Sequence, residues 1–245
     1  MAVLVALSTV LATFLGGYLA LRSRNRMHLV LGLSAGLLLG LVAFDLIPEV
    51  FDLSSLEVGH VPAVMVMFVA GFLSLHILER YSGAHEPHVS QYDDSHEHAH
   101  NTTGIIAASA MVVHVFLDGL AIGLAFQVSS ALGWIVALAV VAHAFTDGLN
   151  TVSMLISAGK WQSRAVMLLI ADGIARLSGA FLGTRIVVND NVLGLYLALF
   201  AGFLIYLATS HILPEAHSSK PSRLTLLATV AGVLFMFAIV NVVHG

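Results

Sequence analysis

The sequence predicts an all-α integral membrane protein with eight transmembrane helices and both termini outside. Its composition, the spacing of its apolar stretches and the distribution of its basic residues all support this fold class. Of the 245 residues, 58% are hydrophobic and 10% are charged, and the mean hydropathy is +0.95. Soluble proteins carry about 25% charged residues, so this chain has too few for an ordinary aqueous surface. We therefore expect the lipid bilayer to be its main solvent.

Apolar stretches of membrane-spanning length recur along the whole chain. About 20 apolar residues cross the hydrocarbon core of a bilayer as a helix. The stretches lie at 3–21, 29–50, 61–80, 104–127, 131–157, 164–187, 192–214 and 224–243. Because most of the connections are short, sequential helices should pack antiparallel in a single polytopic membrane domain over 1–245.

The basic residues predict the orientation of these helices. Lys and Arg gather on the cytoplasmic side of membrane proteins. One set of loops holds Arg22, Arg24, Arg26, Arg80, Lys160, Arg164, Lys220 and Arg223, whereas the opposite side holds Arg185. The first apolar stretch is followed, not preceded, by arginines, which favours a retained helix over a signal peptide. We therefore expect a multi-pass protein of the cell (inner) membrane with periplasmic or extracellular termini.

Two pairs of similar sequence segments predict an inverted repeat. Residues 45–49 read Asp-Leu-Ile-Pro-Glu and residues 211–215 read His-Ile-Leu-Pro-Glu, in helices expected to run in opposite directions. Residues 114–119 read His-Val-Phe-Leu-Asp-Gly and residues 143–148 read His-Ala-Phe-Thr-Asp-Gly. Transporters built from inverted repeats bind their substrates near the bilayer midplane. The alternative is a chance likeness between short apolar helices.

The polar segment 81–103 is the exception among the connections, and we expect a flexible cytoplasmic loop. It carries His85, His88, His96, His98 and His100 among acidic residues. The segment has too few apolar residues to fold alone. It is either an auxiliary loop that gathers cations weakly or a linker that tolerates sequence change.

The composition also narrows the chemistry. No basic patch is present, so nucleic acid is not an expected partner. The chain has no cysteine, which excludes disulfides and thiolate ligands and leaves His, Asp and Glu as metal ligands. A divalent cation and the lipid bilayer are the expected partners, no prosthetic group is expected, and a homodimer stays open.

Two His-x-x-x-Asp pairs are the strongest functional signal. An ionisable side chain at the bilayer centre costs about 2.5–3.5 kcal/mol. His114 and Asp118 lie in the middle of the fourth stretch, and His143 and Asp147 in the middle of the fifth. Each pair shares one helix face because its members are four residues apart. Facing each other, the pairs would supply four N/O ligands and two charges, which suits Zn²⁺ or a similar divalent ion.

Other interpretations of these pairs stay open. Each pair could be a hydrogen bond that only holds helices together, although two matching pairs at matching depth favour a metal. His114 and His143 could be axial ligands of a haem, but haem faces are usually lined by apolar groups. An intramembrane metal-dependent enzyme would need an open ligand position and a separate general base. A proton-coupled carrier would use the aspartates without bound metal.

Further polar residues outline an expected transport pathway. Asp45 and Glu49 lie toward the outer end of the second helix. His76 on the third helix, with His211 and Glu215 on the seventh, lies toward the cytoplasmic end. Glutamates near helix ends are often only solvated at the interface, so Asp45 and His211 are the stronger candidates.

These motifs resemble the ZIP (Zrt/Irt-like) family of metal transporters, in its bacterial type. The family's fourth helix typically reads His-Asn-x-Pro-Glu-Gly, matched by residues 114–119, and its fifth His-x-x-x-Glu-Gly, matched by residues 143–148. The Pro-Glu ends at 48–49 and 214–215 and the His-rich loop are also similar. The resemblance implies movement of Zn²⁺, or of Fe²⁺, Mn²⁺ or Cd²⁺, toward the cytoplasm by a protein that is not an enzyme.

The sequence departs from the family pattern at several positions. Asp118 and Asp147 replace glutamates, and Leu117 and Thr146 replace the motif prolines. Many members hold a second metal with the residue after the fourth-helix His and a Glu on helix six; here Val115 cannot ligate. Aligning the small residues 179–183 places Arg176 at that glutamate. We expect a mononuclear site in which Arg176 replaces the second metal by its charge; the alternative is that Arg176 only pairs with Asp172.

Overall fold

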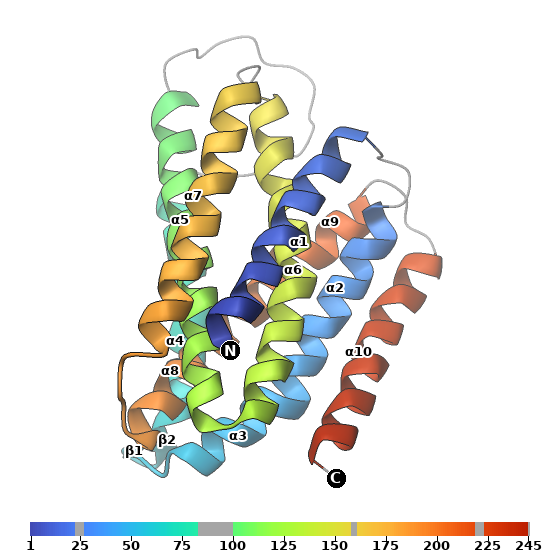
Figure 1. Ribbon diagram of the computed structural model, residues 1–245. Coiled ribbons are helices and arrows are strands. Elements are labelled where there is room, and N and C mark those ends of the chain that lie inside the picture. The colour runs from blue at the N-terminus through green and yellow to red at the C-terminus, as the bar shows by residue number, and fades with distance from the viewer. Residues whose placement is uncertain (23–26, 83–99, 158–160, 219–222, 245) are drawn as a thin grey trace.

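The computed structural model of the chain is a bundle of long, closely packed helices (Figure 1). It describes residues 1–22, 27–82, 100–157, 161–218 and 223–244. The long helices are α1 (Ala2–Arg22), α2 (Met27–Leu41), α4 (Ala63–Ser82), α5 (His100–Val128), α6 (Ser130–Ser157), α7 (Trp161–Gly183), α8 (Asp190–Tyr206) and α10 (Arg223–His244). Every predicted apolar stretch overlaps one of them, which confirms the all-α fold class.

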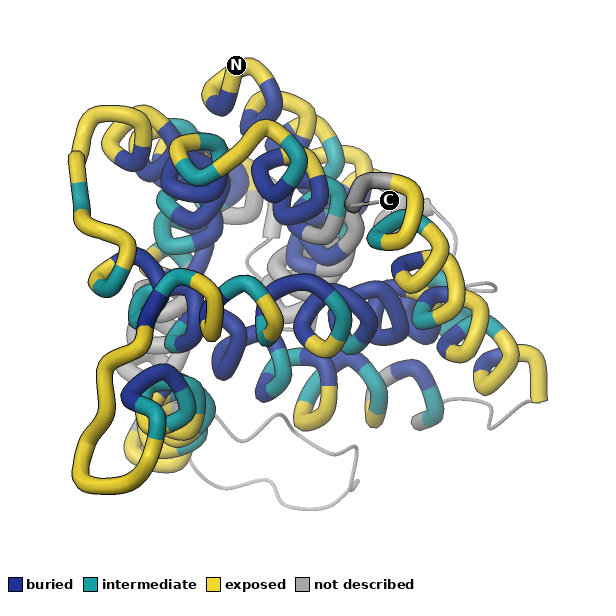
Figure 2. The backbone as a smooth tube through the Cα atoms, turned by 90° about the horizontal axis from the view of Figure 1, so that it is seen from below, coloured by how far each residue is buried: buried dark blue, intermediate teal, exposed yellow. Residues whose placement is uncertain are grey.

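The outer surface of the bundle is apolar, as expected for a protein in lipid. Figure 2 shows buried residues on the inner sides of the helices and exposed ones at the periphery. Exposed side chains on α10 include Leu224, Leu227, Leu234, Phe235 and Phe237. Among the described residues, four helical segments have the length and composition to cross a membrane, and four shorter apolar helices accompany them. Such a surface would be insoluble in water and is compatible with a multi-pass membrane protein.

Two helices of the bundle contain matching π-helical turns. In η1 (Val42–Leu46) the N–H of Ile47 bonds to the carbonyl of Val42, and α3 (Ile47–Leu53) follows. In η2 (Leu207–Ile212) the N–H of Leu213 bonds to the carbonyl of Ala208, and α9 (Leu213–Ser218) follows. Each turn directly precedes a Pro-Glu end. Proline cannot donate to the carbonyl four residues earlier and its ring clashes there, which a widened turn relieves.

The helix pairings have the symmetry of an inverted repeat. The four most extensive contacts are α1 with α6, α7 with α5, α2 with α10, and α8 with α4. Exchanging α1 with α7, α2 with α8, α4 with α10, and α5 with α6 converts this set of pairs into itself. The matching π-helical turns of α2 and α8 obey the same exchange. The predicted inverted repeat is thus confirmed.

Two predicted boundaries are wrong. The stretch 61–80 begins in a hairpin of β1 (Glu57–Val58) and β2 (Val61–Pro62), whose turn uses Gly59 at a φ of 66°. Glycine adopts this left-handed conformation without strain, so the turn can be two residues long. The stretch 164–187 ends as a helix at Gly183. Both limits were predicted from apolar composition alone, and apolar residues also occur in turns just beyond a helix.

The glycine of each repeated motif allows a close approach of two helices. A Cβ atom at Gly119 on α5 would collide with the carbonyl oxygen of Arg176 on α7. A Cβ atom at Gly148 on α6 would likewise collide with the carbonyl oxygen of Thr13 on α1. Small residues let membrane helices approach in this way. Each glycine follows its motif aspartate directly, so the same contact sets the depth and spacing of that aspartate.

We predict that Gly148→Val destabilises the bundle by about 1–3 kcal/mol, the usual cost of overpacking. The added methyl groups must push α1 and α6 apart because backbone atoms, not flexible side chains, block them. The measurement is the thermal unfolding midpoint of the purified protein in detergent. Gly59→Asn is the control, since no atom lies within 4 Å of a Cβ there and Asn tolerates positive φ. Equal midpoints for Gly148→Val and wild type would contradict the close approach.

Candidate metal centre

The two His-x-x-x-Asp pairs meet in the interior of the bundle. His114 and Asp118 lie on α5, and His143 and Asp147 lie on the antiparallel α6. One ligand atom from each of the four side chains can be chosen so that all four lie within 4.8 Å of one another. The helices run without a break through positions 117 and 146, where the family has prolines. The predicted convergence of the two faces is therefore present.

All four side chains are withdrawn from solvent. His114 and Asp147 are 7% and 6% exposed, and Asp118 and His143 are 0% exposed. Nε2 of His143 lies 3.0 Å from Oδ2 of Asp118, within hydrogen-bond distance, and Nε2 of His114 lies 3.6 Å from the same oxygen. The two imidazole rings are 5.9 Å apart between centroids. Asp118 is thus the centre of the cluster.

Several buried polar atoms in the cluster have no hydrogen-bond partner. Among the described residues, these include both ring nitrogens of His114 and Oδ1 of Asp118. Buried polar atoms are paired in the great majority of cases, because leaving one unpaired costs about 1–3 kcal/mol. Imidazole nitrogen and carboxylate oxygen are the donor atoms that Zn²⁺ and similar ions bind. The donor set therefore fits a divalent cation.

Arg176 on α7 joins the two carboxylates. Its NH2 donates to Oδ2 of Asp118 at 3.1 Å and to Oδ2 of Asp147 at 3.2 Å. The guanidinium is 1% exposed. The expected alternative, a pairing of Arg176 with Asp172 one turn away, is not formed, since both carboxylate oxygens of Asp172 lack a hydrogen-bond partner among the described residues. Arg176 is thus a permanent positive charge beside both candidate metal-binding aspartates.

Two threonines of α1 position Arg176, and the sequence analysis missed them. NH1 of Arg176 donates to Oγ1 of Thr13 at 3.0 Å and to the carbonyl oxygen of Thr9 at 3.4 Å. The sequence carries a signal that Thr13 in α1 corresponds to Arg176 in α7, because both precede a glycine at the same spacing. Thr13 precedes Gly16 by three residues, as Arg176 precedes Gly179. A Cβ at either glycine would collide with the carbonyl oxygen of a motif phenylalanine, Phe145 or Phe116.

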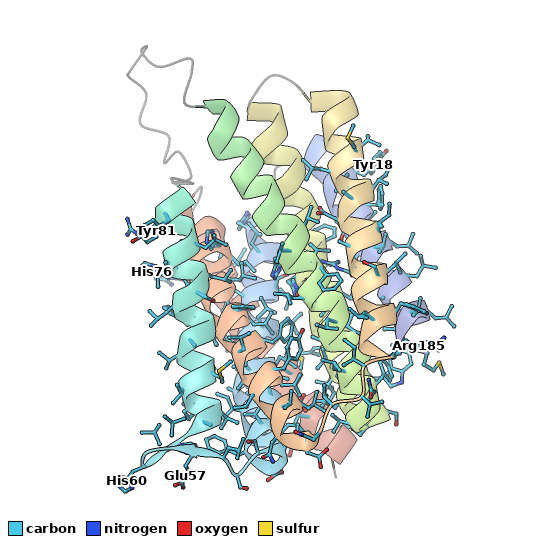
Figure 3. All side chains as sticks on the ribbon, turned by 90° about the vertical axis from the view of Figure 1, so that its left-hand side faces the viewer. Tyr18, Glu57, His60, His76, Tyr81 and Arg185 are labelled. Carbon is cyan, nitrogen blue, oxygen red and sulfur yellow. The ribbon has the colours of Figure 1, made fainter. Side chains whose placement is uncertain are left out.

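The expected pathway residues lie outside this cluster. Asp45 is buried in η1, and Glu49 is half-buried on α3. His76 on α4 and His211 on η2 are half-buried, and their rings pack against Tyr206 with centroid separations of 5.8 and 5.6 Å. Figure 3 shows His76 on α4, close to Tyr81 at one end of that helix. Their roles in transport stay predictions.

Some predicted residues lie outside the described part of the chain. These are the loop histidines His85, His88, His96 and His98, together with the side chains of His100, where α5 begins, and of Glu215. Residues 81–82 belong to α4 and residues 100–103 to α5, so the predicted loop limits of 81–103 are too wide. The loop prediction for the residues between stays an expectation.

Comparison with known proteins places this architecture in a family. The family model described as ZIP Zinc transporter matches residues 80–240. The chain belongs to this ZIP family. A protein named Zinc transporter ZupT from Chlorobium luteolum is 30% identical over 253 residues, which cover 96% of this chain and 95% of that protein. A protein of the same name from Corynebacterium aurimucosum is 27% identical over 92% of this chain and 91% of its own length.

The region matched by the ZIP model contains the cluster. The matched residues 80–240 include α5, α6 and α7, which carry the four candidate ligands and Arg176. A shorter match reaches the fly protein named Zinc transporter foi, which is 29% identical over 50% of this chain and 17% of its own length. The roles of the four candidate ligands and of Arg176 stay predictions.

We predict that Thr13→Val destabilises the protein by about 1–3 kcal/mol. Valine has the shape of threonine but cannot accept the hydrogen bond from NH1 of Arg176, so a buried charged donor loses a partner. The thermal unfolding midpoint of the purified protein checks this. Thr184→Val, which removes an exposed hydroxyl at the end of α7, should leave the midpoint within experimental error. A midpoint for Thr13→Val equal to that of Thr184→Val would contradict the assigned contact.

Proposed function

We propose that this protein moves divalent cations, Zn²⁺ foremost, across the membrane toward the cytoplasm through a site formed by His114, Asp118, His143 and Asp147. The observation that carries this proposal is the convergence of four buried N/O ligands within 4.8 Å on two facing helices. Membership in the ZIP family and the names of the full-length relatives support transport of zinc. The chain is a transporter and not an enzyme.

The orientation follows from the distribution of positive charge. Arg22, Arg80 and Arg223 lie at or near one set of helix ends, whereas Arg185 follows the opposite end of α7. Figure 1 marks both termini in the lower half of the bundle, away from the C-terminal ends of α1 and α6. Because the arginine-rich side of a membrane protein is usually cytoplasmic, the termini face outward. A cation would then enter from the side of Asp45 and leave past His76 and His211.

The chemistry of one transport step rests on charge compensation. A hydrated divalent ion loses most of its water on entering a low-dielectric site, so the protein must replace that water with ligands. Asp118 and Asp147 supply two negative charges, and the two imidazoles supply neutral nitrogen donors. Arg176 lies 3.1 Å from Asp118 and would repel a second cation. The proposed site accordingly holds one ion, and Arg176 takes the position of a second metal.

The remaining alternatives find less support in the cluster. A haem would need a flat gap between the two imidazoles, but the Asp118 carboxylate lies within 3.0 and 3.6 Å of their Nε2 atoms. A proton carrier without bound metal predicts no ion in the purified protein, so metal analysis separates it from the proposed site. We propose that the bound metal is cargo and that no prosthetic group is present.

Metal stoichiometry is the direct test. Purified protein equilibrated with Zn²⁺ should bind about one ion per protomer at the midplane, as four N/O ligands suit a single zinc. Asp118→Asn should abolish that binding and lower uptake into proteoliposomes at least tenfold, because both the central ligand and half of the compensating charge are lost. Asp190→Asn, which removes an exposed carboxylate at the start of α8, should bind and transport as wild type. Two midplane ions would contradict the mononuclear site.

Acid should inhibit uptake. Metal ligands must be deprotonated to bind, so protons compete with the cation for the histidines and aspartates. We expect the initial rate of Zn²⁺ uptake into proteoliposomes to fall steadily from about pH 8 to about pH 5, with the interior buffered at a constant pH. A rate that does not change over this range would count against a His/Asp site.

A further inference from the structure

Asp172 is a buried carboxylate that the proposed function does not use. It lies on α7 and is 1% exposed, and neither of its oxygens has a hydrogen-bond partner among the described residues. A buried carboxyl group without partners is costly, and such groups are rare unless they pair in some state of the protein. Its electrostatic neighbours are Asp147 and Arg176. The question is which group it pairs with.

Arg176 is the partner within reach. It lies four residues after Asp172 on α7, so both side chains occupy one face of the helix a turn apart. The Nε of Arg176 is buried and also lacks a hydrogen-bond partner. An unpaired donor and an unpaired acceptor therefore lie on the same helix face. A change of the arginine rotamer is the simplest way to join them.

The proposed cation and Arg176 compete for the same atoms. Oδ2 of Asp118 and Oδ2 of Asp147 both accept from NH2 of Arg176. A divalent ion held by these carboxylates would lie against the guanidinium, and two positive charges in a low-dielectric site repel strongly. Loading of the site thus favours withdrawal of the guanidinium toward another anion.

The charge balance of the site points to Asp172 as the anion that receives Arg176. Asp118, Asp147 and Asp172 carry three negative charges when ionised, and Arg176 carries one positive charge. The excess is two, which one divalent cation cancels. Without Asp172 the loaded site would keep a net positive charge inside the membrane, where an isolated charge is costly.

The inverted repeat places Asp172 and Arg176 at positions that correspond to two threonines of the other half. When α7 is exchanged with α1, Arg176 corresponds to Thr13 and Asp172 corresponds to Thr9. The two members of each pair lie at the same spacing before Gly179 and Gly16, respectively. One half of the repeat therefore carries two hydroxyls where the other half carries an acid and a base. The two charges therefore lie on adjacent turns of one half of the repeat only.

We propose that Asp172 is a positioning residue that receives the guanidinium of Arg176 when a divalent cation occupies Asp118 and Asp147. This inference rests on the proposed function. In the cation-free protein Arg176 neutralises the two metal-binding carboxylates, and in the loaded protein it neutralises Asp172. Arg176 thereby takes the place of the cation whenever the site is empty.

The zinc affinities of the wild-type protein and four purified variants, measured by calorimetry at neutral pH, test this exchange. We expect Asp172→Asn to weaken Zn²⁺ binding about 10–100-fold, the usual effect of losing a group that supports metal ligands. The double variant Asp172→Asn/Arg176→Gln has the wild-type excess of two negative charges, so its affinity should return to within about threefold of wild type. Asp172→Glu keeps the charge and should also bind nearly as wild type. Asp52→Asn, at an exposed position of α3, controls for the loss of a distant carboxylate.

Each outcome decides between an exchange and a merely structural role. An unrestored double variant overturns the inference, because the guanidinium would then not be the group that Asp172 has to receive. Unchanged affinity in Asp172→Asn overturns it as well. The cation-free fold does not use the Asp172 carboxylate, so a misfolded Asp172→Asn protein, shown by gel filtration, also contradicts the proposal. Absence of Zn²⁺ binding in wild type would instead refute the proposed function itself.

Discussion

Asp118 and Asp147 share the guanidinium of Arg176 in the interior of the bundle, and the surrounding helices are arranged to keep that contact dry. Two carboxylates there would each cost several kcal/mol if left uncompensated. The single NH2 group that bonds to both, at 3.1 and 3.2 Å, offsets part of this cost. The other terminal nitrogen is held by α1 through Thr13 and Thr9. Four helices therefore meet at one positive charge.

Glycine contacts make this meeting possible. Gly119 brings α5 against α7 and Gly148 brings α6 against α1, in both cases so closely that a Cβ atom would not fit. Because each glycine directly follows a motif aspartate, close packing and ligand placement depend on the same turn of helix. The inverted repeat duplicates this unit, so the two aspartates approach a common centre from opposite halves of the protein. The π-helical turns before Pro48 and Pro214 provide further matched irregularities in α2 and α8.

The departures from the family pattern acquire a common physical meaning in this arrangement. An aspartate is one methylene shorter than a glutamate, and the carboxylates of Asp118 and Asp147 still reach a shared guanidinium because their helices are so close. Arg176 brings a permanent positive charge to the centre, and Asp172 adds a matching negative charge one turn away. The cluster as a whole retains the charge balance that suits one divalent ion. The proposed replacement of a second metal by an acid and a base is thus electrostatically self-consistent.

The sequence by itself determined the fold class, the approximate limits of the helices and the four residues of the central cluster. Apolar stretches of bilayer length and ionisable side chains within them carry strong signals, because lipid penalises every uncompensated polar group. The tertiary structure decided which partner Arg176 selects, since Asp172 on its own helix and the aspartates of α5 and α6 were equally compatible with the sequence. It also decided the roles of Thr9 and Thr13, which lie more than 160 residues from Arg176 along the chain. Contacts between distant segments depend on how closely helices pack, and glycines in separate helices fix that distance only once the helices are assembled.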